Sequence, residues 1–195
     1  MSLDKSGKKD LYLNPDEELI DDCRMNDRKA QLELYKRYYK AMYNTAYRIT
    51  KHTAEAEDAM QEAFLDAFRK IDTYSGEAAF GAWLRRIVVN KSIDHLKKQE
   101  KWKMSDMDDK DIPEVVEENP VEILSYKVDL IRKEIENLPD RYRVILSLHL
   151  LEGYDHEEIT QILGLSYNAT RTKYSRARQK LILALRGKNL DPNLN

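Results

Sequence analysis

The sequence predicts an all-α protein made of two small helical domains joined by an acidic linker, with a helix-turn-helix as the second domain. Charged residues make up 35% of the 195 residues and only 6 residues are glycine, a composition that suits helices better than sheets. Apolar residues recur at helical spacing on both sides of residues 100–124, and no alternation is long enough for a strand. The length fits one ordinary domain or two small ones.

The first helical block is predicted to begin near Pro15. Acidic residues follow this proline, and they are favourable near the positive end of a helix. The Ser75-Gly76 pair indicates a loop. Further helices are predicted at residues 34–49, 55–71 and 80–98, with breaks at 51–54 and 72–79.

Residues 100–124 differ sharply from the sequence on either side. They are acidic, contain Pro113 and Pro120, and lack a sustained apolar stripe, which is typical of a linker. About 25 extended residues could span roughly 80 to 90 Å. A loop packed on its own domain is the alternative. The expected division is a disordered segment at 1–14, helical domains at 15–99 and 125–187, a flexible linker at 100–124, and a disordered tail at 188–195.

The clearest functional pattern extends from Asp155 to Leu185. Residues 155–163 form a short amphipathic segment, Gly164 suits a turn, and Ser166 is a candidate N-cap for a second helix. In a helix-turn-helix, the early residues of the second helix meet base edges in the major groove. Its inward face is predicted to hold Thr170, Tyr174, Ala177, Leu181 and Leu185, and its outward face Asn168, Ala169, Thr172, Lys173 and Arg176.

The charge distribution supports nucleic-acid binding although the net charge is only -2. Residues 85–103 hold seven Lys or Arg against two acids, and residues 167–188 hold seven Lys or Arg and no acid. The nine acids of residues 100–122 mask these two basic segments in the total. An ordinary helical hairpin with a solvated basic face is the alternative, which the absence of acids and the glycine turn make less favoured.

Several classes of protein are not expected. Cys23 is the sole cysteine, so neither an internal disulfide nor a cysteine-rich metal site is possible, and a reducing, cytoplasmic setting fits. No apolar run approaches the roughly 18 residues of a membrane helix, and the first ten residues lack the apolar core of a signal peptide. The four histidines show no metal spacing, and no glycine-rich phosphate loop occurs. We therefore expect no enzyme, catalytic residue, metal, cofactor, small-molecule substrate or membrane insertion.

Three motifs in the same order resemble the extracytoplasmic-function (ECF) group of bacterial RNA polymerase sigma factors. Residues 153–166 (GYDHEEITQILGLS) and 172–181 (TKYSRARQKL), with LPDRYR at 138–143, are similar to the last domain of that family. Residues 56–65 (AEDAMQEAFL) are similar to its polymerase-binding helix, and residues 80–98 to its promoter-melting and minus-ten helix. The resemblance covers about residues 20–99 and 127–186. Where the family often has Gly-Thr-Val, this chain has Asn168-Ala169-Thr170, so the promoter sequence is not predicted.

The resemblance implies a sigma factor that binds core polymerase, through its clamp helices and flap, and directs promoter-specific initiation. The helix at 55–71 is expected to bury Met60, Ala63, Phe64, Ala67 and Ile71. Its outward face is the expected polymerase-binding surface: Asp58, Gln61, Glu62, Leu65 and Arg69. The linker resembles the connector that the family threads toward the polymerase active site and RNA exit, although a solubilising spacer is an equal alternative.

The resemblance also implies two DNA-binding surfaces. The expected minus-ten residues, which would melt and read that element, are Tyr74, Arg85, Arg86, Asn90, Lys91, Asp94, Lys97 and Lys98. The expected minus-thirty-five residues are Asn168, Ala169, Arg171, Thr172, Lys173, Arg176, Arg178 and Lys180. Core packing is an alternative for Tyr74, and the apolar residues on several faces of the 80–98 helix leave its DNA-binding side open. The same resemblance makes an anti-sigma partner expected.

Two other functions are compatible with parts of the sequence. A stand-alone helix-turn-helix regulator, with the first block as a sensing or dimerisation module, would bind specific DNA tightly without polymerase. A helical adaptor that binds only protein would show no promoter dependence and little effect of reversing charge at Lys173 and Arg176.

Overall fold

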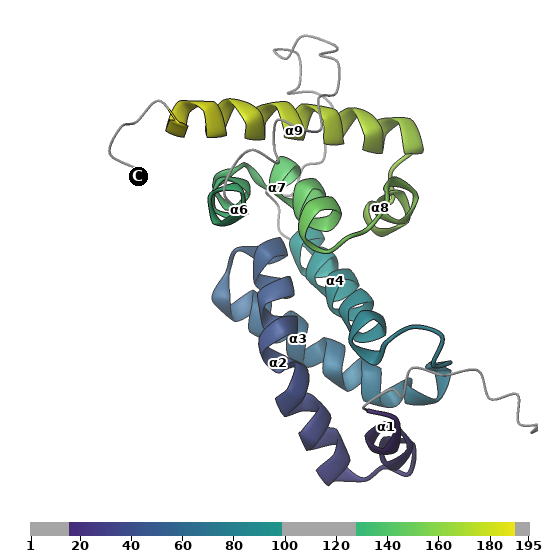
Figure 1. Ribbon diagram of the computed structural model, residues 1–195. Coiled ribbons are helices and arrows are strands. Elements are labelled where there is room, and N and C mark those ends of the chain that lie inside the picture. Colours follow the sequence, from purple (N-terminus) through teal and green to yellow (C-terminus); the bar gives the residue numbers. More distant parts are fainter. Residues whose placement is uncertain (1–15, 99–127, 190–195) are drawn as a thin grey trace, which may run out of the picture.

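The computed structural model describes residues 16–98 and 128–189, and every regular element in these two ranges is helical (Figure 1). The expected all-α fold of two domains is therefore confirmed. The expectations for residues 1–14, for the linker at 100–124 and for the end of the chain beyond residue 189 lie outside the described residues.

The first domain consists of four α-helices and a short 3-10 turn. The elements are α1 (Glu17–Arg24), α2 (Arg28–Thr50), α3 (Thr53–Arg69), η1 (Ile71–Thr73) and α4 (Phe80–Lys98). Asp27 caps the start of α2, because its carboxylate accepts hydrogen bonds from the backbone N–H groups of Lys29 and Ala30. Lys51 ends α2 in a left-handed conformation (φ 56°), which turns the chain into α3 at the predicted break.

Helices α2, α3 and α4 pack against one another around the core of the first domain. The five residues predicted to point inward from α3 are all buried, which confirms that face. Small alanines alternate with Met60 and Phe64 along it, so α2 and α4 can both approach α3 closely. At the start of α4, the rings of Tyr74, Phe80 and Trp83 pack with centroids 5.4 to 5.6 Å apart and form part of the core.

The second domain contains the predicted helix-turn-helix. Its elements are α6 (Val128–Asn137), α7 (Asp140–Leu146), a π-helical turn η3 (Ser147–Leu151), α8 (His156–Leu163) and α9 (Tyr167–Asn189). A capping box begins α8: the Asp155 carboxylate accepts from the N–H of Glu158, and the Glu158 carboxylate accepts from the N–H of Asp155. Gly164 ends α8 at φ 70°, and the Ser166 hydroxyl accepts from the N–H of Ala169 at the start of α9.

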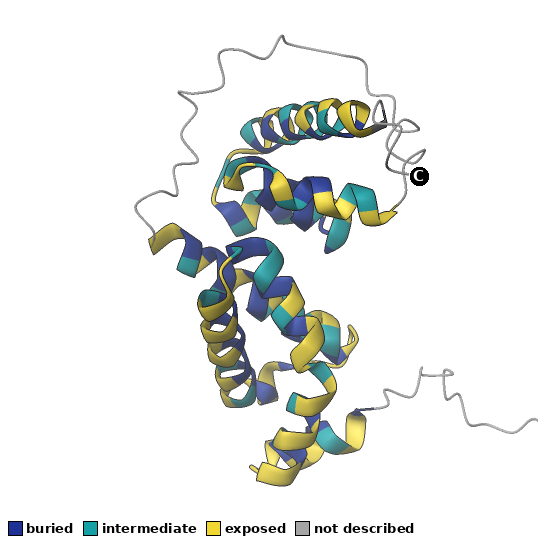
Figure 2. Cartoon of the chain, turned by 90° about the vertical axis from the view of Figure 1, so that its left-hand side faces the viewer, coloured by how far each residue is buried: buried dark blue, intermediate teal, exposed yellow. Residues whose placement is uncertain are grey.

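The two domains touch each other directly. The second domain lies on the end of the first at which α2 ends, and α4 reaches α8 (Figure 1). Ile49, Val89, Ile93 and Leu96 of the first domain belong to the same buried apolar cluster as the core of the second domain. In Figure 2 the buried positions of both domains meet at this junction.

Candidate nucleic-acid interface

Helix α4 presents a single exposed stripe between its two packed faces. Arg86, Asn90, Asp94 and Lys97 follow one another at intervals of three or four residues, and each is exposed. Lys98 extends the stripe by one residue. The sequence alone did not show which side of α4 could face DNA. The burial of the other sides leaves this stripe as the exposed one, and five of the eight predicted minus-ten residues lie on it. The stripe offers three cations, one amide and one carboxylate to a ligand.

Two other predicted minus-ten residues form ion pairs at the edges of α4. The Lys91 ammonium lies 2.9 Å from an Asp66 carboxylate oxygen and 3.6 Å from Glu62, both on α3. The hydrogen bond between Lys91 and Asp66 lowers the pKa of Asp66 and raises the pKa of Lys91. The Arg85 guanidinium lies 3.6 Å from the carboxylate of Glu152 in the second domain.

Tyr74 lies in the core rather than on the surface of the 72–79 loop. Only 5% of its surface is exposed, its ring packs on Phe80 and Trp83, and its hydroxyl donates to the carbonyl of Ala78 at 2.6 Å. These contacts favour the packing role that was the alternative for this residue. Stacking of a base on Tyr74 would require the loop to leave this conformation.

The outward face of α3 is exposed as predicted. Asp58, Gln61, Leu65 and Arg69 point away from the core, and Leu65 is 56% exposed among polar neighbours. Glu62 is also exposed but sits nearer α4, where its carboxylate contacts His95 at 3.2 Å as well as Lys91. An exposed leucine with a polar rim has the composition of a protein–protein contact.

The start of α9 presents the predicted recognition face with one correction. Asn168, Arg171 and Thr172 are exposed, Ala169, Arg176 and Arg178 are half-buried, and Lys180 is exposed. Lys173 was expected on the outward face, but it is 5% exposed, so that part of the expectation is wrong. The reason is its position: it lies one turn after the buried Thr170 and one turn before the buried Ala177, on the packed side of α9.

A cluster of three rings that was not predicted packs α9 against the rest of the second domain. The rings of His149 of η3, His156 of α8 and Tyr174 of α9 pack with centroids 4.6 to 4.9 Å apart, the two histidines tilted and Tyr174 edge-on to both. One nitrogen of His149 lies 2.8 Å from the carbonyl oxygen of Tyr154. The three residues come from three different elements, and Tyr174 stands 18 residues after His156, so no local pattern could reveal that they meet.

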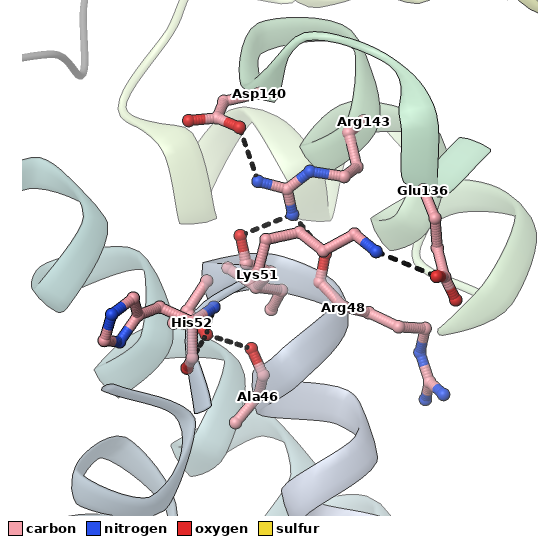
Figure 3. Close-up of polar contacts among 9 residues, drawn as sticks. Ala46, Arg48, Lys51, His52, Glu136, Asp140 and Arg143 are labelled. Carbon is pink, nitrogen blue, oxygen red and sulfur yellow. Dashed lines mark hydrogen bonds and ion pairs between the residues drawn. The ribbon is translucent and has the colours of Figure 1, made fainter. Parts of the chain in front are cut away.

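Polar residues at the junction of the domains were also missed from the sequence. The Arg143 guanidinium donates to the backbone carbonyls of Arg48 and Ile49 at the end of α2, and to Asp140 (Figure 3). Lys51 and Glu136 pair across the junction at 2.8 Å. Arg143 belongs to the motif at 138–143, but its target lies about 95 residues away, beyond the reach of a pattern.

Buried Glu152 makes a second group of polar contacts across this junction. Its side chain is 1% exposed, and its carboxylate accepts from Arg48 Nε at 2.8 Å and from the Thr45 hydroxyl at 3.2 Å. Burial, with Glu152 close by, raises the pKa of Tyr154 to about 12, so this phenol stays neutral.

Two further features were sought in the described ranges, a group of metal-binding side chains and a membrane-spanning helix. In residues 16–98 and 128–189, His, Cys, Asp and Glu side chains form no group of three that could hold a metal. Within the same ranges, no helix has the length and apolar character needed to cross a membrane.

Comparison with known proteins agrees with the geometry of both domains. Residues 34–102 match Sigma-70 region 2, and residues 129–181 match Sigma-70 region 4. The chain is 27% identical over 160 residues to RNA polymerase sigma factor YlaC of Bacillus subtilis, which covers 80% of this chain and 92% of that protein. It is 28% identical over 176 residues to the ECF RNA polymerase sigma-E factor of Haemophilus influenzae, covering 85% and 93%.

A solved structure shares the fold. The sigma factor RpoE of Bartonella quintana, in complex with the anti-sigma factor NepR, superposes with a TM-score of 0.51 and 22% sequence identity, over 79% of this chain and 95% of that one. The two matched regions occur in order, and one falls on each described domain. The chain therefore belongs to the sigma-70 family of RNA polymerase sigma factors, in its extracytoplasmic-function group.

Proposed function

We propose that this chain binds the core of bacterial RNA polymerase in the cytoplasm and directs it to promoters, reading one promoter element with each domain. The observation that carries this proposal is the presence of two separate exposed surfaces, the stripe on α4 and the start of α9, one on each domain. Two surfaces on one chain raise each other's effective concentration at a promoter that carries both elements.

The start of α9 suits the minus-thirty-five element. Asn168 and Thr172 are short polar side chains that can meet base edges in a major groove, and Arg171 beside them can bind a base or a phosphate. Arg178 and Lys180 lie further along the helix, where cations contact phosphates and fix its register on the duplex. Lys173 is not placed at the DNA in this proposal, because it is buried.

The exposed stripe of α4 suits the minus-ten element. Arg86, Lys97 and Lys98 supply cations for the backbone of a separated strand, and Asn90 and Asp94 between them can form hydrogen bonds with unstacked bases. Arg85 and Lys91 flank the stripe and could join it once their carboxylate partners are exchanged for phosphates.

The outward face of α3 suits the polymerase clamp. Leu65 supplies an exposed apolar anchor, and Asp58, Gln61 and Arg69 supply its polar rim. An anti-sigma protein is a second proposed partner, since the superposed RpoE structure is itself a complex with an anti-sigma factor. The proposal assigns no chemical step to this chain, because a sigma factor positions the polymerase that catalyses the reaction.

Promoter-selective transcription with charge-reversed variants tests these assignments. Arg171→Glu and Arg86→Glu reverse an exposed cation on each proposed DNA surface, and Lys133→Glu and Lys36→Glu reverse an exposed cation elsewhere in the same domains. With reconstituted polymerase, we expect the first pair to lower specific initiation at least tenfold, because a phosphate-binding cation becomes a repelling anion. The control pair should initiate like the wild type. Equal losses in both pairs, or none in the first, would refute these DNA surfaces.

A further inference from the structure

The second turn of α9 carries an exposed arginine that lies against an aromatic ring. The guanidinium carbon of Arg171 is 6.0 Å from the ring centroid of Tyr167, the first residue of the helix. We propose that Arg171 reads a guanine in the minus-thirty-five element, and that Tyr167 is the positioning residue that orients its guanidinium for this base. The inference rests on the proposed function and deepens it, because it assigns one base to a surface whose sequence preference the motifs did not predict.

A hydrogen-bonded pair of threonines fixes the rotation of α9 on its neighbour α8 (Figure 1). The hydroxyl oxygens of Thr160 and Thr170 lie 3.0 Å apart, and the Thr160 hydroxyl also lies 2.7 Å from the carbonyl oxygen of His156. A carbonyl can only accept, so Thr160 donates to His156 and accepts the hydroxyl hydrogen of Thr170. Thr170 is fully buried. The valine that the family often has in its place offers no hydroxyl, so this bond is a feature of the present chain.

This rotation determines which residues at the start of α9 point outward. A helix turns by about 100° per residue, so Asn168 and Thr172 point almost directly away from the buried Thr170. Tyr167 and Arg171 stand one turn apart on a flank of the same outward face, and both are exposed. In a helix-turn-helix, the early residues of the second helix meet base edges. Arg171 therefore stands beside the two short polar side chains that face the floor of the groove.

The ring of Tyr167 restricts the Arg171 side chain and leaves its N–H groups available. A guanidinium is attracted to an aromatic face by the quadrupole of the ring. Residues 167–188 contain no acid, and among the described residues no carboxylate pairs with Arg171. A planar guanidinium that is already oriented loses less rotamer freedom when it binds. The pair with Tyr167 thus prepares Arg171 for a ligand that requires a defined direction.

Guanine is the ligand that matches such an oriented guanidinium. In the major groove guanine presents two neighbouring acceptors, O6 and N7, which accept two parallel N–H groups of one arginine. Adenine places an amino donor beside its N7, and the pyrimidines have no N7, so each of them loses at least one of the two hydrogen bonds. A phosphate accepts from many directions and needs no orienting ring. Lys180, an exposed cation further along α9, suits that role.

Selection from a duplex DNA library with a randomised segment tests the guanine assignment. The immobilised full-length chain, alone and bound to bacterial core polymerase, selects fragments that are then sequenced. We expect the wild type to enrich a guanine whose preference falls about tenfold in Arg171→Ala, because a bidentate pair supplies discrimination of that order. The preferences at the other positions should stay the same. Lys180→Ala, at an exposed cation of the same helix, is the matched control and should weaken the binding of all fragments alike.

Two substitutions of Tyr167 separate positioning from folding. Tyr167→Leu removes the aromatic face and should lower the preference for that guanine by about two- to fivefold, the effect of an exposed cation–π pair. Tyr167→Phe keeps the aromatic face and should retain the wild-type preference. Circular dichroism checks that each variant is folded. An equal loss of affinity for every fragment in Tyr167→Leu, with the guanine preference intact, would refute the positioning role.

Two results would overturn the reading of guanine by Arg171. In the first, Arg171→Ala loses affinity for all fragments alike and keeps every base preference, which is the behaviour of a phosphate contact. In the second, the wild type enriches no guanine that depends on Arg171, whether or not core polymerase is bound. Enrichment of this guanine by the chain alone, with no effect of core polymerase on the selected fragments, would instead refute the proposed function and leave the reading of guanine intact.

Discussion

Gly164 and Gly187 allow one chemical change to be compared in two backbone conformations. Gly164 ends α8 at φ 70°, whereas Gly187 lies inside α9, and an added Cβ would meet nothing within 4 Å at either site. Neither added methyl group would clash with a neighbour, so the two substitutions differ in the backbone conformation at each site. An alanine at Gly164 must adopt a left-handed conformation, which costs about 1 to 2 kcal/mol. Gly187 lies in the last turn of α9, where an alanine should stabilise the helix by up to about 0.5 kcal/mol, because it loses less conformational entropy on folding.

We expect Gly164→Ala to lower the free energy of unfolding and Gly187→Ala to raise it, a difference of about 2 kcal/mol from the same methyl group. Urea unfolding followed by circular dichroism at fixed pH and salt measures both values. A shift of the same sign in both variants, or no change in Gly164→Ala, would refute the assignment of the helix-turn-helix turn to a left-handed Gly164.

Three further predictions concern the folded chain. Burial, reinforced by Asp22 and Asp27, raises the pKa of Cys23 from 9.0 to about 11, so its thiolate should be about 100-fold scarcer near neutral pH. Iodoacetamide should therefore label Cys23 slowly until urea unfolds the chain. Lys91 lowers the pKa of Asp66 below its ordinary 3.8. The stability lost in Asp66→Asn should therefore be constant above pH 3.8 and vanish as the pH falls through the folded-state pKa of Asp66. Acid titration of the stability of both proteins measures this difference. Asp155→Ala removes the cap of α8 and should cost about 1 kcal/mol, or a melting temperature roughly 2 to 4 °C lower.

A specific result would contradict each of these three predictions. Equal labelling rates of Cys23 in the folded and unfolded chain would show that the thiol is accessible. A stability difference between wild type and Asp66→Asn that does not shrink anywhere in the acid titration of the folded chains would show that the carboxylate charge does not contribute. An unchanged melting temperature for Asp155→Ala, with Asp129→Ala at an exposed site as its control, would show that the capping box adds no stability.

Patterns within single helices were predictable from the sequence, whereas contacts between distant segments were not. The inward face of α3 and the turn at Gly164 follow from periodicity and local backbone preference, and both are confirmed. Helix α4 was ambiguous because it is buried on two sides: Leu84 and Val88 pack in the first domain, while Val89 and Ile93 pack against the second. No single periodic stripe can describe a helix with two partners.

Contacts between distant segments also determine where individual site residues lie. Tyr74 precedes the Ser75-Gly76 pair, which favoured a loop position, yet its ring packs against Phe80 and Trp83. Glu152 showed no local signal at all, since its donors stand 67 to 107 residues earlier in the chain. The direct junction of the domains therefore emerged only from the three-dimensional structure.

Reconstitution with core RNA polymerase tests the central claim most directly. The purified chain is mixed with bacterial core enzyme and a library of genomic fragments, and the transcription start sites are sequenced. We predict discrete start sites that share a pair of upstream elements, and their loss when the chain is omitted. Random starts with core enzyme, together with retention of specific fragments by the chain alone, would contradict the account and favour a stand-alone helix-turn-helix regulator.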